Sequence, residues 1–212
     1  MAWIVTNGYL TEAQMQNNAT EFIGQFKRFY PDVTDYILAA LLGNMEGESN
    51  INPGLWENTP AESGGYGLVQ WTPYTDYSQY WPGNWRGNGD AQVETLYIEA
   101  NNGTQWYPSN LAPEVGLPVT PPWNLNGYYG MNIRMASEYG LERLTNAFIV
   151  YYLRPATVHH PERTTYANKW YQWITGQPPI PPGPGPGPGP GPGGQTNIGA
   201  IMAWWMKKRY VL

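Results

Sequence analysis

Apolar side chains recur every three to four residues early in the chain, which is the spacing of an amphipathic helix. Thr11 and Gln14 precede this pattern in the order of a capping box, and Pro31 follows it. The sequence therefore predicts a helix that begins after Thr11 and ends before Pro31. Its apolar positions are Met15, Ala19, Phe22, Ile23, Phe26 and Phe29.

A second, more apolar helix is predicted to begin near Asp32 or Thr34, since both residue types favour the N-cap position. Two acidic residues, Glu46 and Glu48, lie at its C-terminal end. Glu48 falls at the end of the apolar stripe and Glu46 at its edge, so helical spacing leaves open which carboxyl group points inward. The stripe consists of Val33, Ile37, Leu38, Leu41, Leu42 and Met45.

The middle of the chain is expected to be irregular. Residues 49–71 are predicted to form a loop or short hairpin that holds a glycine-rich segment. Thr72 is expected to cap a short helix to about residue 81, and Asp90 a helix to about residue 101. Residues 102–132 are rich in Pro, Gly and Asn, and we expect this long segment to form part of a groove wall.

Two further helices are predicted near the end of this region. One covers about residues 137–153, with an uncertain start because Gly140 lies inside it, and the other runs from Pro161 to a C-cap at Gly176. The total is five or six helices without a convincing alternating strand. The predicted fold class is mainly α.

The composition changes sharply after residue 177. Residues 178–194 consist almost wholly of Pro and Gly, which is typical of an extended linker that packs poorly. Residues 195–212 combine an apolar patch with three basic residues. We expect a body at 1–177 and a C-terminal segment that docks on a larger assembly, lies at a membrane interface or is a loose tail.

Charge and cysteine content exclude several classes of function. The net charge is −5, and residues 1–177 carry 8 Lys and Arg against 16 Asp and Glu, a balance of −8. An acidic body argues against nucleic acid as a partner. The absence of cysteine excludes disulfides, thiolate nucleophiles and Cys-ligated metals. We also expect no signal peptide and no cofactor, and His159-His160 beside Pro161 is a poor metal site because its side chains point apart.

Aromatic residues make up 15% of the chain, with 11 Trp and 17 Tyr. Rings of this kind either fill a protein core or stack on the apolar faces of sugars. Composition leaves these two interpretations equally open.

Two short motifs, one at the end of the second predicted helix and one in the glycine-rich segment, resemble motifs of a known family. Residues 48–53, with the sequence ESNINP, resemble the E-S-x-x-N-P stretch of goose-type lysozymes and lytic transglycosylases. Residues 67–70, GLVQ, resemble the G-L-x-Q element that follows it there. Together with similarity at both ends of residues 10–175, the motifs resemble most closely the phage tail-tip lysozyme family. This resemblance implies a lysozyme-like helical domain with long groove-forming loops.

The resemblance assigns the catalytic acid to Glu48 rather than Glu46. Cleavage of a glycosidic bond needs a protonated acid beside the leaving oxygen, and burial raises the pKa of a carboxyl group. Glycines in the loop allow the backbone to approach a substrate closely. The candidate substrate-binding residues are Ser49, Asn52, Tyr66, Gly67 and Gln70, although Gln70 equally suits a tie between the loop and the helix end.

The second catalytic group is less well defined. Glu57, Glu62 and Asp76 are the nearby carboxylates, and Glu62 is preferred because it directly precedes the glycine loop. A retaining enzyme places it about 5 Å from the acid and an inverting enzyme about 6.5–9.5 Å away. Goose-type enzymes and transglycosylases do not require such a nucleophile, so hydrolysis and intramolecular transfer both stay open.

The resemblance implies a virion-associated enzyme that opens peptidoglycan during phage entry. Its bond would be the β-1,4 linkage between N-acetylmuramic acid and N-acetylglucosamine. Its partners would be the glycan strand and other virion proteins, reached through residues 195–212. The alternative hypothesis is a structural virion protein that binds cell-wall glycan without cutting it.

Overall fold

A computed structural model of the chain describes residues 2–59 and 61–178. The linker predicted beyond residue 178 and the C-terminal segment 195–212 lie outside the described residues. No helix in the described ranges has the length and apolarity needed to cross a bilayer. The elements are α1 (Glu12–Phe29), α2 (Asp35–Ser49), β1 (Trp56–Asn58), β2 (Ser63–Tyr66), α3 (Thr75–Ser78), α4 (Gly89–Asn102), η1 (Ala112–Val115), α5 (Leu125–Tyr129), α6 (Ile133–Phe148), η2 (Ile149–Leu153) and α7 (Pro161–Thr175).

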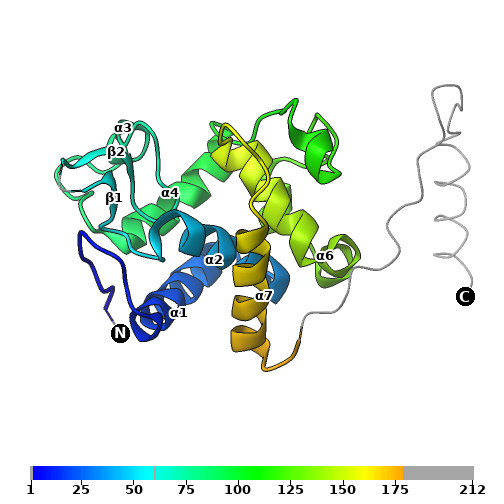
Figure 1. The fold of residues 1–212 in the computed structure, drawn as a ribbon, viewed down its shortest axis with the longest axis horizontal. Helices are drawn as coiled ribbons and strands as arrows, with labels where there is room; N and C mark the ends of the chain where they lie inside the picture. Colours follow the sequence, from blue (N-terminus) through cyan, green and yellow to red (C-terminus); the bar gives the residue numbers. More distant parts are fainter. Residues whose placement is uncertain (1, 60, 179–212) are drawn as a thin grey trace, which may run out of the picture.

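Helix α2 is the centre of the fold. Every residue from Tyr36 to Met45 is buried, as expected for a helix that is apolar on all sides. Helices α6 and α7 pack along it, α1 packs against α4, and the hairpin and α3 gather at the other end of the molecule (Figure 1). The predicted mainly α class is therefore confirmed.

Two glycines let α7 approach α2 closely. A Cβ atom on Gly43 would lie 2.6 Å from the backbone nitrogen of Ala167 and 2.7 Å from the carbonyl oxygen of Arg163. A Cβ on Gly47, one turn later, would lie 3.1 Å from the Arg163 side chain. The two helices therefore touch backbone to backbone, and Arg163 reaches the end of α2.

Gly43→Ala is expected to lower the free energy of unfolding by about 3 kcal/mol, because backbone atoms of α7 cannot yield as a side chain can. Urea denaturation followed by circular dichroism measures the change. Gly24→Ala is the matched control, since a Cβ there meets nothing within 4 Å. Equal stability of the two variants would contradict the close helix contact.

The hairpin is confirmed as the local structure between the motifs. Strands β1 and β2 pair antiparallel, with Trp56 opposite Tyr66 and Asn58 opposite Ser63. Helix α1 also begins as predicted, since Thr11 and Gln14 form a capping box. Thr34 is the N-cap of α2, which resolves the choice between Asp32 and Thr34.

Two predicted caps are wrong. The Thr72 hydroxyl donates to the carbonyl of Gln70 at 3.0 Å, the Thr72-Pro73 peptide is cis, and α3 begins only at Thr75. Helix α4 is capped by Asn88, whose Oδ1 accepts from the amide of Ala91 at 3.0 Å. Asp90 instead accepts the indole N–H of Trp3 at 2.8 Å. In both places the side chain near the helix start forms a hydrogen bond other than the predicted cap.

The later helices differ from prediction mainly at one start. Helix α6 begins after Asn132, several residues before 137, and Gly140 interrupts it with φ 70° and ψ 165°. It continues directly into the π-helical turn η2. Helix α7 begins at Pro161 and ends at the left-handed Gly176, as predicted.

Candidate active site

Glu48 lies on the last turn of α2, where the chain leaves the core. Asn50 and Ile51 both have left-handed backbones, with φ 53° and 54°, and they end the helix abruptly. The Glu48 side chain is 17% exposed and lines a cavity of about 440 Å³. Tyr9, Trp56, Glu57 and Gln70 line the same cavity, and Tyr9 is 82% exposed at its edge.

An arginine from α7 holds the Glu48 carboxylate. Arg163 Nη1 lies 2.6 Å from Glu48 Oε1, and the Arg163 side chain is only 8% exposed. The same nitrogen donates to Asn44 Oδ1 at 3.4 Å. This buried contact orients the Glu48 side chain toward α7 at the edge of the cavity.

Glu46, the other candidate acid, faces α7 instead of the cavity. Its Oε1 accepts from Lys169 Nζ at 2.8 Å and its Oε2 from the indole of Trp170 at 2.6 Å. Both oxygens are thus used in helix packing. Of the two glutamates at the end of α2, Glu48 lines the cavity and Glu46 does not.

Ser49 and Asn52, the other polar residues of the first motif, are buried in the scaffold. The Ser49 hydroxyl donates to the carbonyls of Met45 and Leu68. Asn52 Nδ2 donates to the carbonyls of Thr6 and Gly8, both at 2.8 Å. These contacts fasten the N-terminal segment and the glycine loop to the end of α2, and they leave neither side chain facing the cavity.

The glycine loop also makes internal contacts where substrate contacts were predicted. Tyr66 is 2% exposed, and its hydroxyl accepts from the amide of Gly87 at 2.6 Å. Gly67 has φ 78°, and a Cβ there would lie 2.4 Å from Gln92. Gln70 faces the cavity, but its Nε2 donates to the carbonyls of Leu55 and Gly67. Of these three residues, Gln70 alone lines the cavity.

Among the candidate second carboxylates, Glu57 shares the cavity with Glu48. Its Oε2 accepts from the amide of Gly65 at 2.8 Å, which fixes the side chain across the hairpin. Glu62 lies at the far end of the hairpin, 44% exposed, with its Oε2 2.8 Å from Arg86 Nη1. The structure brings Glu57 to Glu48 and leaves Glu62 outside the residues that line the cavity.

A second cavity, of about 420 Å³, continues the first one. The two share Val69, Gln70, Thr72, Leu153 and Arg154, so they form one groove. The 102–132 segment contributes only Thr104 and Gln105 to it, so the predicted groove wall is confined to the start of that segment. Asp76, the third candidate carboxylate, lines this second part of the groove.

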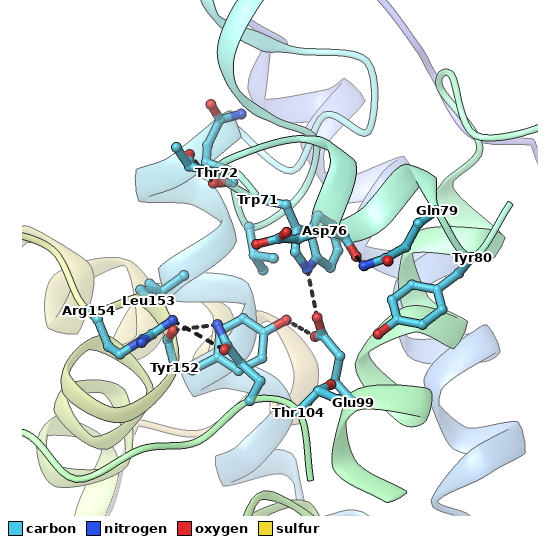
Figure 2. A pocket seen from close by; sticks show the side chains of 13 residues that line it. Trp71, Thr72, Asp76, Gln79, Tyr80, Glu99, Thr104, Tyr152, Leu153 and Arg154 are labelled. Carbon is cyan, nitrogen blue, oxygen red and sulfur yellow. Dashed lines mark hydrogen bonds between the residues drawn. The ribbon is translucent and has the colours of Figure 1, made fainter. Parts of the chain in front are cut away.

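Glu99 of α4 lies at the second cavity and was not predicted as a site residue. It is 5% exposed, and its oxygens accept from the Trp71 indole, at 3.2 Å, and from the Tyr152 hydroxyl (Figure 2). Burial raises its pKa to about 7, against the effect of these hydrogen bonds, and Asp76 adds to the rise. The sequence signal that could have identified Glu99 is its position three residues after Leu96, which places the acid on the buried face of the helix.

Glu99 is expected to make the protein less stable as the pH rises. Its carboxyl group has a higher pKa when folded than when unfolded, so the folded state binds more protons between about pH 4.5 and pH 7. The contribution of Glu99 to the free energy of unfolding is fully present below this pH window and is lost as the pH rises through it. Relative to Glu99→Gln, the wild type should lose on the order of 3 kcal/mol between about pH 5 and pH 8. Denaturant unfolding at both pH values measures this, and parallel curves would contradict it.

No group of three or more metal-binding side chains occurs in residues 2–59 and 61–178. The two histidines contact different acids, His159 with Glu114 and His160 with Glu162. The groove is lined by carboxyl groups, amides, aromatic rings and the guanidinium of Arg154.

Comparison with known proteins shows the family of the chain. The family model for phage tail lysozyme matches residues 17–174, which is most of the chain. The chain belongs to the phage tail lysozyme family. A curated relative, Morphogenesis protein 1 of Bacillus phage B103, is 31% identical over 175 residues. That match covers 81% of this chain and 43% of the relative, so the chain spans less than half of the relative's length.

Membership in the phage tail lysozyme family confirms the resemblance drawn from the two motifs. The matched residues include both motifs, all the helices from α2 to α6 and nearly all of α7. The tail lysozyme groove and both of its cavities lie almost wholly within this match; Tyr9 lies outside it.

Proposed function

We propose that this chain is a virion-associated glycosidase that cleaves the β-1,4 bond between N-acetylmuramic acid and N-acetylglucosamine in peptidoglycan. The observation that carries the proposal is Glu48, a largely buried carboxyl group at the end of a rigid helix that opens onto a groove. Family membership supports the lysozyme-like chemistry, and the groove supports a strand-like substrate.

Glu48 would act as the general acid. It passes a proton to the glycosidic oxygen as the bond from that oxygen to the anomeric carbon breaks, and positive charge builds on the sugar ring. Water then adds to the anomeric carbon in a hydrolase, whereas the sugar's own 6-hydroxyl adds in a transglycosylase, and in either case the proton of the adding hydroxyl passes to a carboxylate of the cavity. Arg163 stabilises the carboxylate that remains after proton transfer.

Glu57 is better placed than Glu62 to act as the second carboxylate. It lines the Glu48 cavity and is held by the Gly65 amide, so it can orient water or stabilise the cationic ring. Tyr9, exposed at the same cavity, is placed to stack on a sugar ring. Neither role was preferred from sequence.

The test is product analysis of purified cell wall after incubation with the protein. Mass spectrometry should show new muropeptide ends at N-acetylmuramic acid, reducing for a hydrolase and 1,6-anhydro for a transglycosylase. New ends at N-acetylglucosamine, or ends within the peptide, would contradict the assigned bond.

A second candidate function is glycan binding without cleavage. The Arg163 contact favours it, because Arg163 Nη1 lies 2.6 Å from Glu48 Oε1 and so occupies one of the two carboxyl oxygens. Binding to cell wall with no new ends after long incubation would support this alternative. Docking of residues 195–212 on another virion protein, or on a membrane, is proposed from sequence alone.

A further inference from the structure

The second cavity has the size and lining of a binding site in its own right. Ligand sites in proteins occupy about 300–1,000 Å³, and this cavity of about 420 Å³ lies in that range. It joins the Glu48 cavity but has its own far wall (Figure 2). That wall consists of Asp76, Gln79, Tyr80, Glu99, Thr104, Gln105 and Tyr152.

The lining suits a neutral, polyhydroxylated ring. The partly exposed Tyr80 offers aromatic surface, and the amides and carboxyl groups near it offer hydrogen bonds, while Trp71 and Tyr152 are buried behind Glu99. Asp76 and Arg154 carry opposite charges, so while Glu99 is neutral the lining has no excess charge that would select an ionic peptide. Arg154 is itself fixed, since its Nη2 donates to Gln105 at 3.3 Å and its guanidinium lies over the Tyr107 ring.

Glu99 is set rigidly at this wall. The Trp71 indole can only donate, so Glu99 Oε1 must accept in every protonation state. The Tyr152 hydroxyl can donate or accept, so it serves Glu99 in either state. Such an acid keeps one geometry whether neutral or ionised.

We propose that this cavity is a second carbohydrate subsite of the groove, where the Glu99 carboxyl group and the Tyr80 ring hold an N-acetylated amino sugar of the glycan strand. The inference rests on the proposed function, since it assumes a peptidoglycan substrate. It goes further by assigning a subsite and the residues that form it.

Binding at this subsite depends on the charge of Glu99. A sugar that covers the ionised group removes its remaining water, whereas covering the neutral group costs little, so binding weakens as Glu99 ionises. The titratable and charged groups that face Glu99 are Asp76 of α3, Tyr129 of α5, Tyr152 of η2 and Arg154. Both tyrosines have pKa values raised well above 10 by burial, so they stay neutral in this range.

The experiment uses the full chain with Glu48→Gln, which keeps the ligand intact, and peptide-free glycan strands as the probe. Calorimetric titration should show binding about fivefold weaker at about pH 8.5 than at about pH 6. Adding Glu99→Gln should abolish this pH dependence. Adding Tyr80→Ala should weaken binding about fivefold at both pH values. Glu94→Gln, on the same helix but outside both cavities, should change nothing.

Two results would overturn the subsite. One is unchanged pH dependence in the Glu99→Gln protein together with unchanged affinity in Tyr80→Ala, each shown to be folded by cooperative unfolding. The other is binding of isolated stem peptides in place of glycan strands. Cleavage by the wild type is measured separately from binding. A negative binding result would therefore reject the subsite without rejecting the proposed function, and a lack of cleavage would reject the proposed function without deciding the binding result.

Discussion

Glu48→Gln is expected to reduce the rate of peptidoglycan cleavage about 10²- to 10⁴-fold, because the amide keeps the shape of the acid but has no proton to give. Zymograms and turbidity assays on purified cell wall measure the loss. Glu62→Gln is the matched control, since Glu62 lies outside the Glu48 cavity and pairs with an exposed arginine. That variant should keep nearly full activity.

Undiminished clearing by Glu48→Gln would remove Glu48 as the acid. Equal losses in both variants would restore Glu62 as the second catalytic group, as first predicted from its place before the glycine loop. A loss in Glu57→Gln comparable to that in Glu48→Gln would support Glu57 in that role.

Arg163→Met is expected to lower the free energy of unfolding by about 3 kcal/mol and to reduce activity as well. Removing one partner of a buried ion pair leaves the other charge without compensation, and Arg163 and Glu48 are 8% and 17% exposed. Urea denaturation gives the stability change. Arg134→Met is the control: its pair with Glu138 is 75% and 54% exposed, so its loss should cost less than about 1 kcal/mol.

The double variant Arg163→Met, Glu48→Gln sharpens this prediction. If the two groups interact directly, the double variant should be more stable than the sum of the two single losses implies. Strict additivity would show that Arg163 stabilises α7 by packing alone and that its contact with Glu48 is incidental.

Local sequence signals predicted the framework of the fold well. Helix α1 with its capping box, the Thr34 cap and the Pro161–Gly176 limits of α7 all depend on residues within a few positions of each other. The failures at Thr72 and Asp90 arose because each side chain found a partner that sequence does not reveal. Trp3, the partner of Asp90, lies 87 positions away.

The site was predictable only in part, because several of its contacts join residues that lie far apart in the sequence. The motif assigned the catalytic acid to Glu48. It could not show that the polar atoms of Ser49, Asn52 and Tyr66 form hydrogen bonds with the backbone of the scaffold. Glu99 becomes visible only when α4, η2 and the glycine loop meet around it. Composition did not decide whether the aromatic residues fill the core or line a groove. Many of them belong to the core, and the fully buried ones include Tyr77, Tyr128, Tyr129, Tyr151 and Trp170.

The Asn44–Arg163 contact spans 119 positions of the chain. Helix α2 is among the first elements made during synthesis, yet the cation that orients its acid arrives with the last described helix. Contacts of such long range form late, because the intervening chain must first be closed into a loop. A growing or truncated chain that stops before residue 163 therefore holds Glu48 without its orienting partner, so the proposed cleavage would require completion of the whole body.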